Sequence, residues 1–288
     1  MAVGAPGPEV LAAFGVPGEP LERLAGGRGL TWRAGAVVLR PHDGAAVTDW
    51  RAEVLATLDH SAAFRTPRPV AARARGTFAV DAGVRTPGRS WRVGEWEAWE
   101  WLPGRADETR VDEVIRAGQA FHQAIAHLDR PAFLASRDGT TDDHAANAVA
   151  AGNAWDRADR MAWGEEPLLP GPALDRLGTA FRPVHAPSQL VHGDLLGNVL
   201  FADGHPPAVI DWPPYWRPAG LGAAIAAVDA VCWHGIPLAR LDALGHGIPE
   251  WGQLLVRALT FRIATLHLLG VWDADAAAQH RPVVDALV

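Results

Sequence analysis

The feature of this 288-residue chain that most constrains its fold is the stretch 190–212, LVHGDLLGNVLFADGHPPAVIDW. Two short apolar runs, NVLF and AVI, flank the turn sequence ADGHPP, which is the pattern of a pair of short strands joined by a turn. Asp194 precedes the first of these strands, Asn198 begins it, and Asp211 directly follows the second. The strand pair therefore predicts that these three side chains are held at one edge.

Asp194, Asn198 and Asp211 are the residue types that phosphoryl transfer from a nucleotide requires. That reaction needs a carboxylate that accepts the proton of the attacking hydroxyl, oxygen ligands for a magnesium ion that bridges the phosphates, and a positive group on the phosphates. We interpret Asp194 as the base, and Asn198 and Asp211 as ligands of Mg²⁺. Two protein oxygens suffice because water and phosphate complete the octahedron of Mg²⁺.

The motif VHGDLLGNVLF…AVIDW resembles the catalytic and metal-binding loops of the aminoglycoside phosphotransferase family, which has a protein-kinase-like fold. His-Gly-Asp stands where protein kinases have His-Arg-Asp, and Ile-Asp-Trp stands where they have Asp-Phe-Gly. The longer stretches GNVLFADG and IDWPPYWRP are similar to an actinobacterial phosphotransferase-like branch. The resemblance implies an α+β, bilobal protein-kinase-like fold, with a small antiparallel β N-lobe over 1–101 and a larger helical C-lobe over 102–288.

The order of the predicted elements agrees with this fold. Alternating and β-branched residues over 24–41 and 68–102, with a helical period over 47–60 between them, predict the order β-β-α-β-β-β for the first hundred residues. Helical periodicity dominates from about residue 107 onward and is interrupted by the two short strands around ADGHPP. We see no internal repeat.

The resemblance also assigns residues that contact the nucleotide phosphates. VVLRP places Arg40 where protein kinases have a lysine, and Glu53 on the following helix matches the acid that pairs with that cation. The segment GGRG lies where the family has its phosphate-covering turn, which consists here of Gly26, Gly27, Arg28 and Gly29. A glycine-rich turn alone is more often an ordinary hairpin turn, so this assignment depends on the resemblance.

The segment AWEWLPG matches the hinge of the family, where main-chain groups receive the adenine edge. Glu100 and Trp101 are the expected contact positions. The resemblance thus implies ATP or GTP as the phosphate donor and Mg²⁺ as the metal. It also implies structural roles for His192 and for Asp229, the latter as a buried acid that anchors the catalytic loop.

Two departures from the kinase pattern bear on activity. All 26 basic residues other than histidine are arginine, so Arg40 is a planar, permanently charged group in place of a compact lysine. Three residues separate Asp194 from Asn198, whereas protein kinases have four. The loop must be tighter, and Gly197 provides a backbone that allows this.

Two functions from different classes remain open. The first is an ATP- or GTP-dependent O-phosphotransferase that acts on a hydroxyl of a small molecule, such as an antibiotic or a natural product. The second is a kinase-like binding protein, or pseudokinase, with a repurposed site and no phosphotransfer. Arg40 and the short loop favour the second, whereas the otherwise complete motif favours the first.

Indications of the acceptor come from two segments. Aromatic rings in WPPYWRP (212–218) could stack on a flat or sugar-like acceptor, but they fit equally well a rigid, proline-fixed turn. Acids in NAWDRADRMAWGEE could meet an amine, although an exposed charged helix face also explains them; they are Asp156, Asp159, Glu165 and Glu166. We expect a small-molecule acceptor, cationic or aromatic, and a monomer or homodimer.

The composition limits the classes of partner. A net charge of −7 and a pI near 5.9 argue against nucleic acid, which requires a basic face. No apolar run approaches the roughly 18 residues of a membrane span, and the N-terminal segment lacks the features of a secretory signal. The single cysteine, Cys232, excludes an internal disulfide and a multi-cysteine zinc site. We therefore expect a cytoplasmic protein without membrane association.

Overall fold

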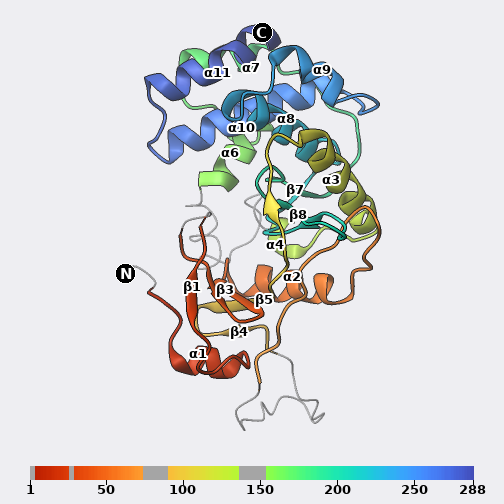
Figure 1. The fold of residues 1–288 in the computed structure, drawn as a ribbon. Coiled ribbons are helices and arrows are strands. Elements are labelled where there is room, and N and C mark those ends of the chain that lie inside the picture. The colour runs from red at the N-terminus through yellow and green to blue at the C-terminus, as the bar shows by residue number, and fades with distance from the viewer. Residues whose placement is uncertain (1–3, 26–28, 74–89, 136–153) are drawn as a thin grey trace. The chain divides into compact units, whose positions relative to one another are not determined.

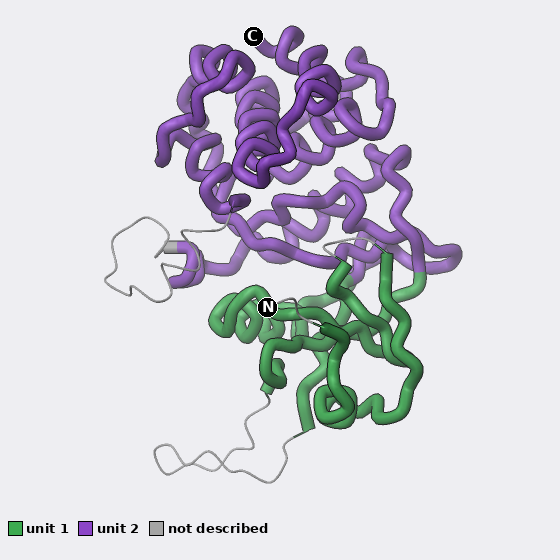
Figure 2. The backbone as a smooth tube through the Cα atoms, turned by 90° about the vertical axis from the view of Figure 1, so that its left-hand side faces the viewer, with its two compact units in different colours: residues 1–60, 66–103 green, residues 61–65, 104–288 purple. Residues whose placement is uncertain are grey.

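The computed structural model describes residues 4–25, 29–73, 90–135 and 154–288. The chain divides into two compact units (Figure 2). Unit 1 comprises residues 1–60 and 66–103, and unit 2 comprises residues 61–65 and 104–288.

Unit 1 contains a five-stranded antiparallel sheet in the order β1-β2-β3-β5-β4 (Figure 1). Its strands are β1 (Leu21–Arg23), β2 (Trp32–Ala34), β3 (Val37–Pro41), β4 (Arg92–Val93) and β5 (Trp96–Glu100). Strands β2 and β3 form a hairpin with a two-residue turn, in which Gly35 has a φ of 57°. A residue without Cβ adopts this left-handed conformation at little cost, which explains the glycine at this position.

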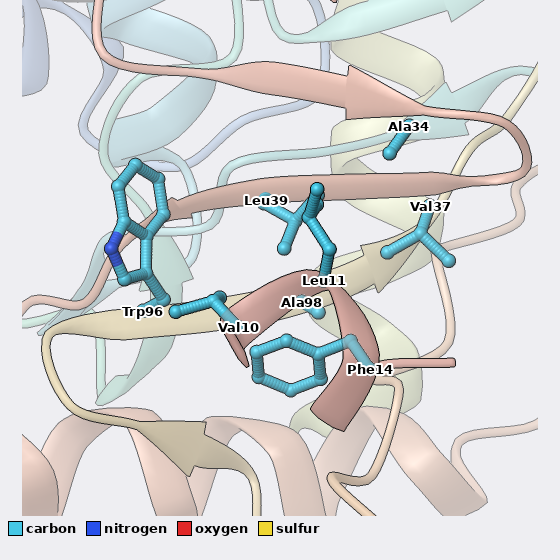
Figure 3. Close-up of a cluster of buried hydrophobic side chains, with 8 residues drawn as sticks. All are labelled: Val10, Leu11, Phe14, Ala34, Val37, Leu39, Trp96 and Ala98. Carbon is cyan, nitrogen blue, oxygen red and sulfur yellow. The ribbon is translucent and has the colours of Figure 1, made fainter. Parts of the chain in front are cut away.

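Helix α1 (Pro8–Ala13) covers part of this sheet with three apolar side chains. Val10, Leu11 and Phe14 point toward the apolar residues of β3 and β5, as Figure 3 shows. The cluster consists of Val10, Leu11, Phe14, Ala34, Val37, Leu39, Trp96 and Ala98. Removing such side chains from water supplies most of the free energy that stabilises a small sheet.

Helix α2 (Ala45–Thr57) is the second helix of unit 1. Its buried residues are Thr48, Arg51, Ala52 and Leu55, which recur at the spacing of one helical face. Arg51 is therefore directed into the unit, and this placement determines the electrostatics of the predicted phosphate site.

Unit 2 contains two small sheets. One has the order β6-β8-β9, with β6 (Arg105–Ala106), β8 (Val199–Phe201) and β9 (Ala208–Val209). The other pairs β7 (Ser188–His192) with β10 (Pro214–Pro218) in antiparallel register. The segment WPPYWRP therefore contributes a strand rather than the turn that we considered, and its prolines are tolerated because β10 pairs on one side only.

Helices make up the rest of the described part of unit 2, and Figure 1 shows α7 to α11 gathered in one group. The helices are α3 (Val111–Ile125), α4 (Ala132–Ala135), α6 (Ala154–Ala162), α7 (Pro172–Thr179), α8 (Leu221–Trp233), α9 (Leu241–Leu244), α10 (Trp251–Leu268) and α11 (Ala274–Leu287), with a 3₁₀ turn at Leu238–Arg240. Helix α10 is apolar on most sides because it packs against α6, α7, α8 and α11.

None of the helices in these described ranges combines the length and the apolar character that crossing a bilayer requires.

Candidate active site

The predicted base, Asp194, lies just after strand β7 in unit 2. The strand ends at His192, and Gly193 connects it to Asp194. The two residues after Asp194 are buried, and Leu195 has no exposed surface. The apolar anchor at Leu195 fixes the main chain, while the side chain of Asp194 stays 45% exposed. A base that acts on a bound hydroxyl needs this combination of a fixed backbone and an accessible carboxylate.

Asn198 lies against Asp194 in spite of the short loop. Its side-chain Nδ2 donates to the main-chain oxygen of Asp194 at 2.8 Å and to Asp194 Oδ2 at 3.2 Å. The main-chain N–H of Asn198 donates to the oxygen of Leu195 at 2.9 Å, which closes a tight turn. Gly197 makes this turn possible with a φ of 84°. The amide nitrogen faces Asp194, so the amide oxygen is the atom left to face a cation.

Asp211 is coupled to Asn198 through the backbone. The N–H of Ile210 donates to the oxygen of Asn198 at 2.9 Å. On the other side, the buried indole of Trp212 donates to the oxygen of Val191 at 3.1 Å. Between these anchors, Asp211 is solvent exposed and has a φ of 50°, a left-handed conformation that costs a non-glycine residue about 1–3 kcal/mol. The structure thus brings the three predicted residues together.

Two buried histidines hold this arrangement from behind. The main-chain N–H of Asp194 donates to His192 Nδ1 at 3.0 Å, and His192 Nε2 donates to the oxygen of Ile210 at 2.9 Å. His122 Nε2 in turn accepts from the N–H of His192 at 2.8 Å, while its Nδ1 donates to the oxygen of Ala219 at 3.1 Å. His192 therefore connects the two loops and does not reach solvent.

The donor set at this edge fits magnesium. Asn198 and Asp211 offer an amide and a carboxylate oxygen, which are the hard ligands that Mg²⁺ prefers, and Mg²⁺ usually binds through few protein groups. The described residues contain no cluster of three or more His, Cys, Asp or Glu side chains that would suit another metal.

One charged residue that the sequence analysis did not identify contacts the base. Arg262 of α10 donates from Nη2 to Asp194 Oδ1 at 2.6 Å, and the same guanidinium holds Asp229 of α8. We expected Asp229 to anchor the backbone of the catalytic loop; the structure places it on Arg262 instead. Burial by itself lowers the pKa of Arg262, but Asp229 and Asp194 raise it above its ordinary value, so the cation stays charged.

In unit 1, the carboxylate partner of Arg40 is not the predicted Glu53. Arg40 Nε donates to Glu97 Oε1 at 2.5 Å, because β3 and β5 place the two residues opposite each other. Arg51 Nη2 binds the same carboxylate at 2.9 Å. Glu53 is exposed, since a residue two positions from the buried Arg51 lies on the other side of α2. An exposed acid, Asp43, lies 3.6 Å from Arg40.

Glu97 is thus a buried acid between two guanidinium groups. Burial raises the pKa of Glu97, but Arg40 and Arg51 together hold it below its usual value. Charged groups of opposite sign satisfy one another here in an interior where each alone would be costly. The indication in the sequence was Glu97 between Trp96 and Ala98 in β5, an acid flanked by apolar residues on both sides.

The predicted hinge positions use their main-chain donors within unit 1. The N–H of Glu100 donates to Arg68 at 2.8 Å, and the N–H of Trp101 donates to Ala36 at 2.9 Å. An adenine edge therefore has no free N–H at these two positions. Gly29 has a φ of 66°, as a turn glycine requires, whereas Gly26, Gly27 and Arg28 lie outside the described residues.

A small hollow that is open to solvent lies in unit 2, between residues 130–165 and strand β10. Its wall includes Tyr215, Trp216 and Arg217 of β10. The ring of Tyr215 packs so closely on Gly193 that a Cβ there would lie 2.4 Å from Tyr215 Cε2. Tyr215 thus lines the hollow and also packs on the residue before Asp194.

Three of the four predicted acids in this region are paired with arginines. Arg217 binds Asp159 at 2.7 Å and Glu165 at 2.6 Å. Glu166 binds Arg157 at 2.6 Å and also Arg160. Asp159, Glu165 and Glu166 thus form ion pairs, and this neutralisation argues against a role for these three in binding an amine-bearing acceptor. Asp156, the fourth predicted acid, is buried and also lines the hollow.

Protein stability is expected to fall by roughly 2 kcal/mol between pH 7 and pH 5 through His122 alone. Burial lowers the pKa of His122 to about 3, while unfolding returns it to its usual value near 6.5. Below pH 6.5 the unfolded chain therefore binds a proton that the folded one excludes, and the loss continues until pH 3. Urea unfolding is to be measured at both pH values. The loss of about 2 kcal/mol between pH 7 and pH 5 should be absent in His122→Gln. It should remain in His127→Gln, a variant of an exposed histidine.

Comparisons with known proteins show the family and the fold of the chain. The model of the phosphotransferase enzyme family (APH) matches residues 22–255. None of the curated proteins matches the sequence. Solved structures with a similar fold include a microcompartment-associated aminopropanol kinase, with 16% identity, a TM-score of 0.52 and coverage of 96% of this chain and 93% of that one. A thermostable mutant of aminoglycoside phosphotransferase APH(4)-Ia, in a ternary complex with AMP-PNP and hygromycin B, has 18% identity, a TM-score of 0.52 and coverage of 93% and 92%.

These likenesses confirm the predicted α+β, protein-kinase-like fold, with an antiparallel N-terminal sheet and a larger helical C-terminal part. The family match covers most of the chain and includes Asp194, Asn198 and Asp211. The prediction of a phosphotransferase with an alcohol group as acceptor is confirmed at the level of the family. The chain therefore belongs to the phosphotransferase enzyme family and is a small-molecule phosphotransferase.

Proposed function

We propose that this protein transfers the γ-phosphoryl group of ATP or GTP to a hydroxyl of a small molecule in a magnesium-dependent reaction. The observation that carries the proposal is the hydrogen-bonded unit of Asp194, Asn198 and Asp211. Asn198 donates its side-chain N–H to Asp194 and accepts at its main-chain oxygen from Ile210, the neighbour of Asp211. A base and two oxygen ligands held in one unit are the protein's main contributions to phosphoryl transfer.

Each residue of this unit has a distinct role in the proposal. Asp194 accepts the proton of the acceptor hydroxyl, as an accessible carboxylate on a fixed loop can do. The oxygen atoms of Asn198 and Asp211 would hold Mg²⁺, which neutralises charge on the phosphates when it is bound. The left-handed backbone of Asp211, held on both sides, fixes the position from which its side chain leaves the chain.

Arg40 is the proposed contact to the nucleotide phosphates in unit 1. Its side chain is 16% exposed, and Glu97 fixes its Nε. A guanidinium offers several N–H donors in one plane, so it can bind a carboxylate with one edge and phosphate with another. Arg51, on the same carboxylate, supplies a second cation, so Arg40 does not have to neutralise Glu97 alone.

The proposed acceptor site is the hollow lined by β10, the strand that pairs with the strand leading to Asp194. Tyr215 and Trp216 offer aromatic faces, and Arg217 with its two acids offers donors and acceptors whose charges are already balanced. Because Asp159 and Glu165 are paired with Arg217, this lining favours a neutral, hydroxyl-bearing ring over a polyamine, although the buried Asp156 also lines it. The proposal therefore keeps the aromatic part of the expected acceptor chemistry and gives less weight to the cationic part.

Nucleotide with magnesium should raise the melting temperature of the protein. At a nucleotide concentration 100 times Kd, binding stabilises the folded state by about 2.7 kcal/mol, which corresponds to a shift on the order of 5 °C for a chain of this size. Thermal unfolding is to be measured with ATP and with GTP, each with and without Mg²⁺. Asp211→Ala should abolish the magnesium-dependent part of the shift.

The matched control is Asp203→Ala, an exposed aspartate in the turn between β8 and β9. It removes the same carboxylate from the same pair of strands, away from the metal position, and should keep the full shift. If neither nucleotide shifts the wild-type protein, with or without magnesium, the proposed site is wrong and the alternative of a kinase-like binding protein is favoured.

A further inference from the structure

Arg262 is a buried cation shared between a helix and the catalytic loop. Only 8% of its side chain is exposed. It grips Asp229 with two hydrogen bonds, Nε to Oδ1 at 2.8 Å and Nη2 to Oδ2 at 2.5 Å. The same Nη2 donates to Asp194 Oδ1 at 2.6 Å. Helices α8 and α10 are thereby connected directly to the predicted base.

The contact with Asp194 goes beyond what burial of Arg262 requires. Asp229 is 4% exposed and by itself neutralises the guanidinium through a two-point contact, which is the usual arrangement of a buried pair. Asp194 is 45% exposed, so water could solvate its carboxylate without Arg262. A third hydrogen bond to an exposed carboxylate fixes the orientation of that carboxylate more than it stabilises the interior.

The two oxygen atoms of Asp194 consequently have different surroundings. Oδ1 receives a short, charge-assisted bond from Arg262. Oδ2 receives a longer bond of 3.2 Å from the neutral amide of Asn198. Oδ2 is therefore the better proton acceptor. The cationic donor Arg262 stabilises the negative charge on Oδ1 and makes that oxygen less basic.

We propose that Arg262 is a positioning residue, which fixes Oδ1 of Asp194 so that Oδ2 takes the proton of the acceptor. This inference rests on the proposed function. In the step itself, the acceptor oxygen forms a bond to phosphorus while its proton moves to Oδ2, and the bond from phosphorus to the leaving nucleotide oxygen breaks. Arg262 is proposed to contact neither the acceptor hydroxyl nor the transferred phosphoryl group. It acts through Asp194, because it holds the carboxylate in the orientation in which Oδ2 faces the acceptor.

Helix α10 contains a matched control residue. Arg257 lies on the same helix. Counted over the whole residue, Arg257 and Arg262 are each 7% exposed. It donates to the main-chain oxygens of Ala162 at 2.8 Å and Arg182 at 3.0 Å, and its guanidinium lies 3.7 Å from the ring centre of Phe181. Arg257 thus has the same residue type, helix and burial, but no contact with the base.

The first experiment compares turnover in Arg262→Met, Arg262→Lys and Arg257→Met, with rates expressed per folded molecule. Arg262→Met should lower kcat by roughly 10- to 100-fold, the effect of a misplaced catalytic group, while KM for the nucleotide stays within about twofold. Arg262→Lys keeps the charge but cannot span both carboxylates, so it should fold and lose kcat to a smaller extent. Arg257→Met should lose stability and keep kcat.

The second experiment does not depend on turnover. Hydrogen–deuterium exchange of the free protein should be faster at residues 193–198 in both Arg262 variants, and unchanged there in Arg257→Met. If the wild-type protein shows no phosphotransfer, the proposed function fails, and exchange alone then decides whether Arg262 orders the loop. Equal exchange at 193–198 in Arg262→Lys and the wild type, or an unaltered kcat in Arg262→Lys, would overturn the inference.

Discussion

Asp194→Asn is expected to lower kcat by about 10³-fold, with KM for the nucleotide changed by no more than about twofold. The substitution preserves the size of the side chain and leaves an oxygen for Arg262 Nη2, which now donates to Oδ1 at 2.6 Å. It replaces Oδ2 with an NH₂ group, which cannot accept a proton and which faces another donor, Nδ2 of Asn198. The chemical step is therefore affected, whereas nucleotide binding is not.

The measurement is the rate of transfer from labelled nucleotide to a panel of hydroxyl acceptors, with neutral sugars and nucleosides beside aminoglycosides. Asp285→Asn is the control, because Asp285 also binds an arginine, Arg176 at 2.7 Å, but on the exposed faces of α11 and α7. It should retain the wild-type rate. A rate in Asp194→Asn within tenfold of the wild type would show that another group removes the proton.

The local part of the site could be predicted from sequence. Asp194, Asn198 and Asp211 lie within eighteen consecutive residues, and a single pair of strands joined by a turn fixes their mutual position. The sequence also indicated that Gly197 permits a tighter loop, and the left-handed φ of 84° at Gly197, with Asn198 hydrogen-bonded to Asp194, agrees with this.

The long-range part could not be predicted, because it depends on tertiary packing. Arg262 is 68 residues from Asp194 in sequence, and nothing in the periodicity of α10 distinguishes it from Arg257 on the same helix. Glu97 was missed for a related reason. Its pairing with Arg40 follows from the register of β3 on β5, whereas the resemblance pointed to an acid on α2. Residues that contact across elements need the register of those elements, which a single sequence does not contain.

Gly222→Ala is expected to destabilise the protein by about 3 kcal/mol, at the upper end of the range for overpacked cores. Gly222 is the second residue of α8, and a Cβ there would lie 2.6 Å from the main-chain oxygen of His192 and 2.8 Å from the His122 ring. Neither neighbour can turn away, since one is backbone and the other is held by two hydrogen bonds. Alanine's better helix propensity recovers at most about 1 kcal/mol.

The same collision should reduce activity, because the carbonyl that must move belongs to the residue two positions before Asp194. Gly252→Ala separates this effect from helix propensity: Gly252 is the second residue of α10, and a Cβ there would meet no atom within 4 Å. Urea unfolding should show Gly252→Ala unchanged or slightly stabilised, and its kcat should equal that of the wild type. If both glycine variants behaved alike, then close packing of α8 on His192 would not be what holds the catalytic loop, and its order would have to come from the strand pair and Arg262 alone.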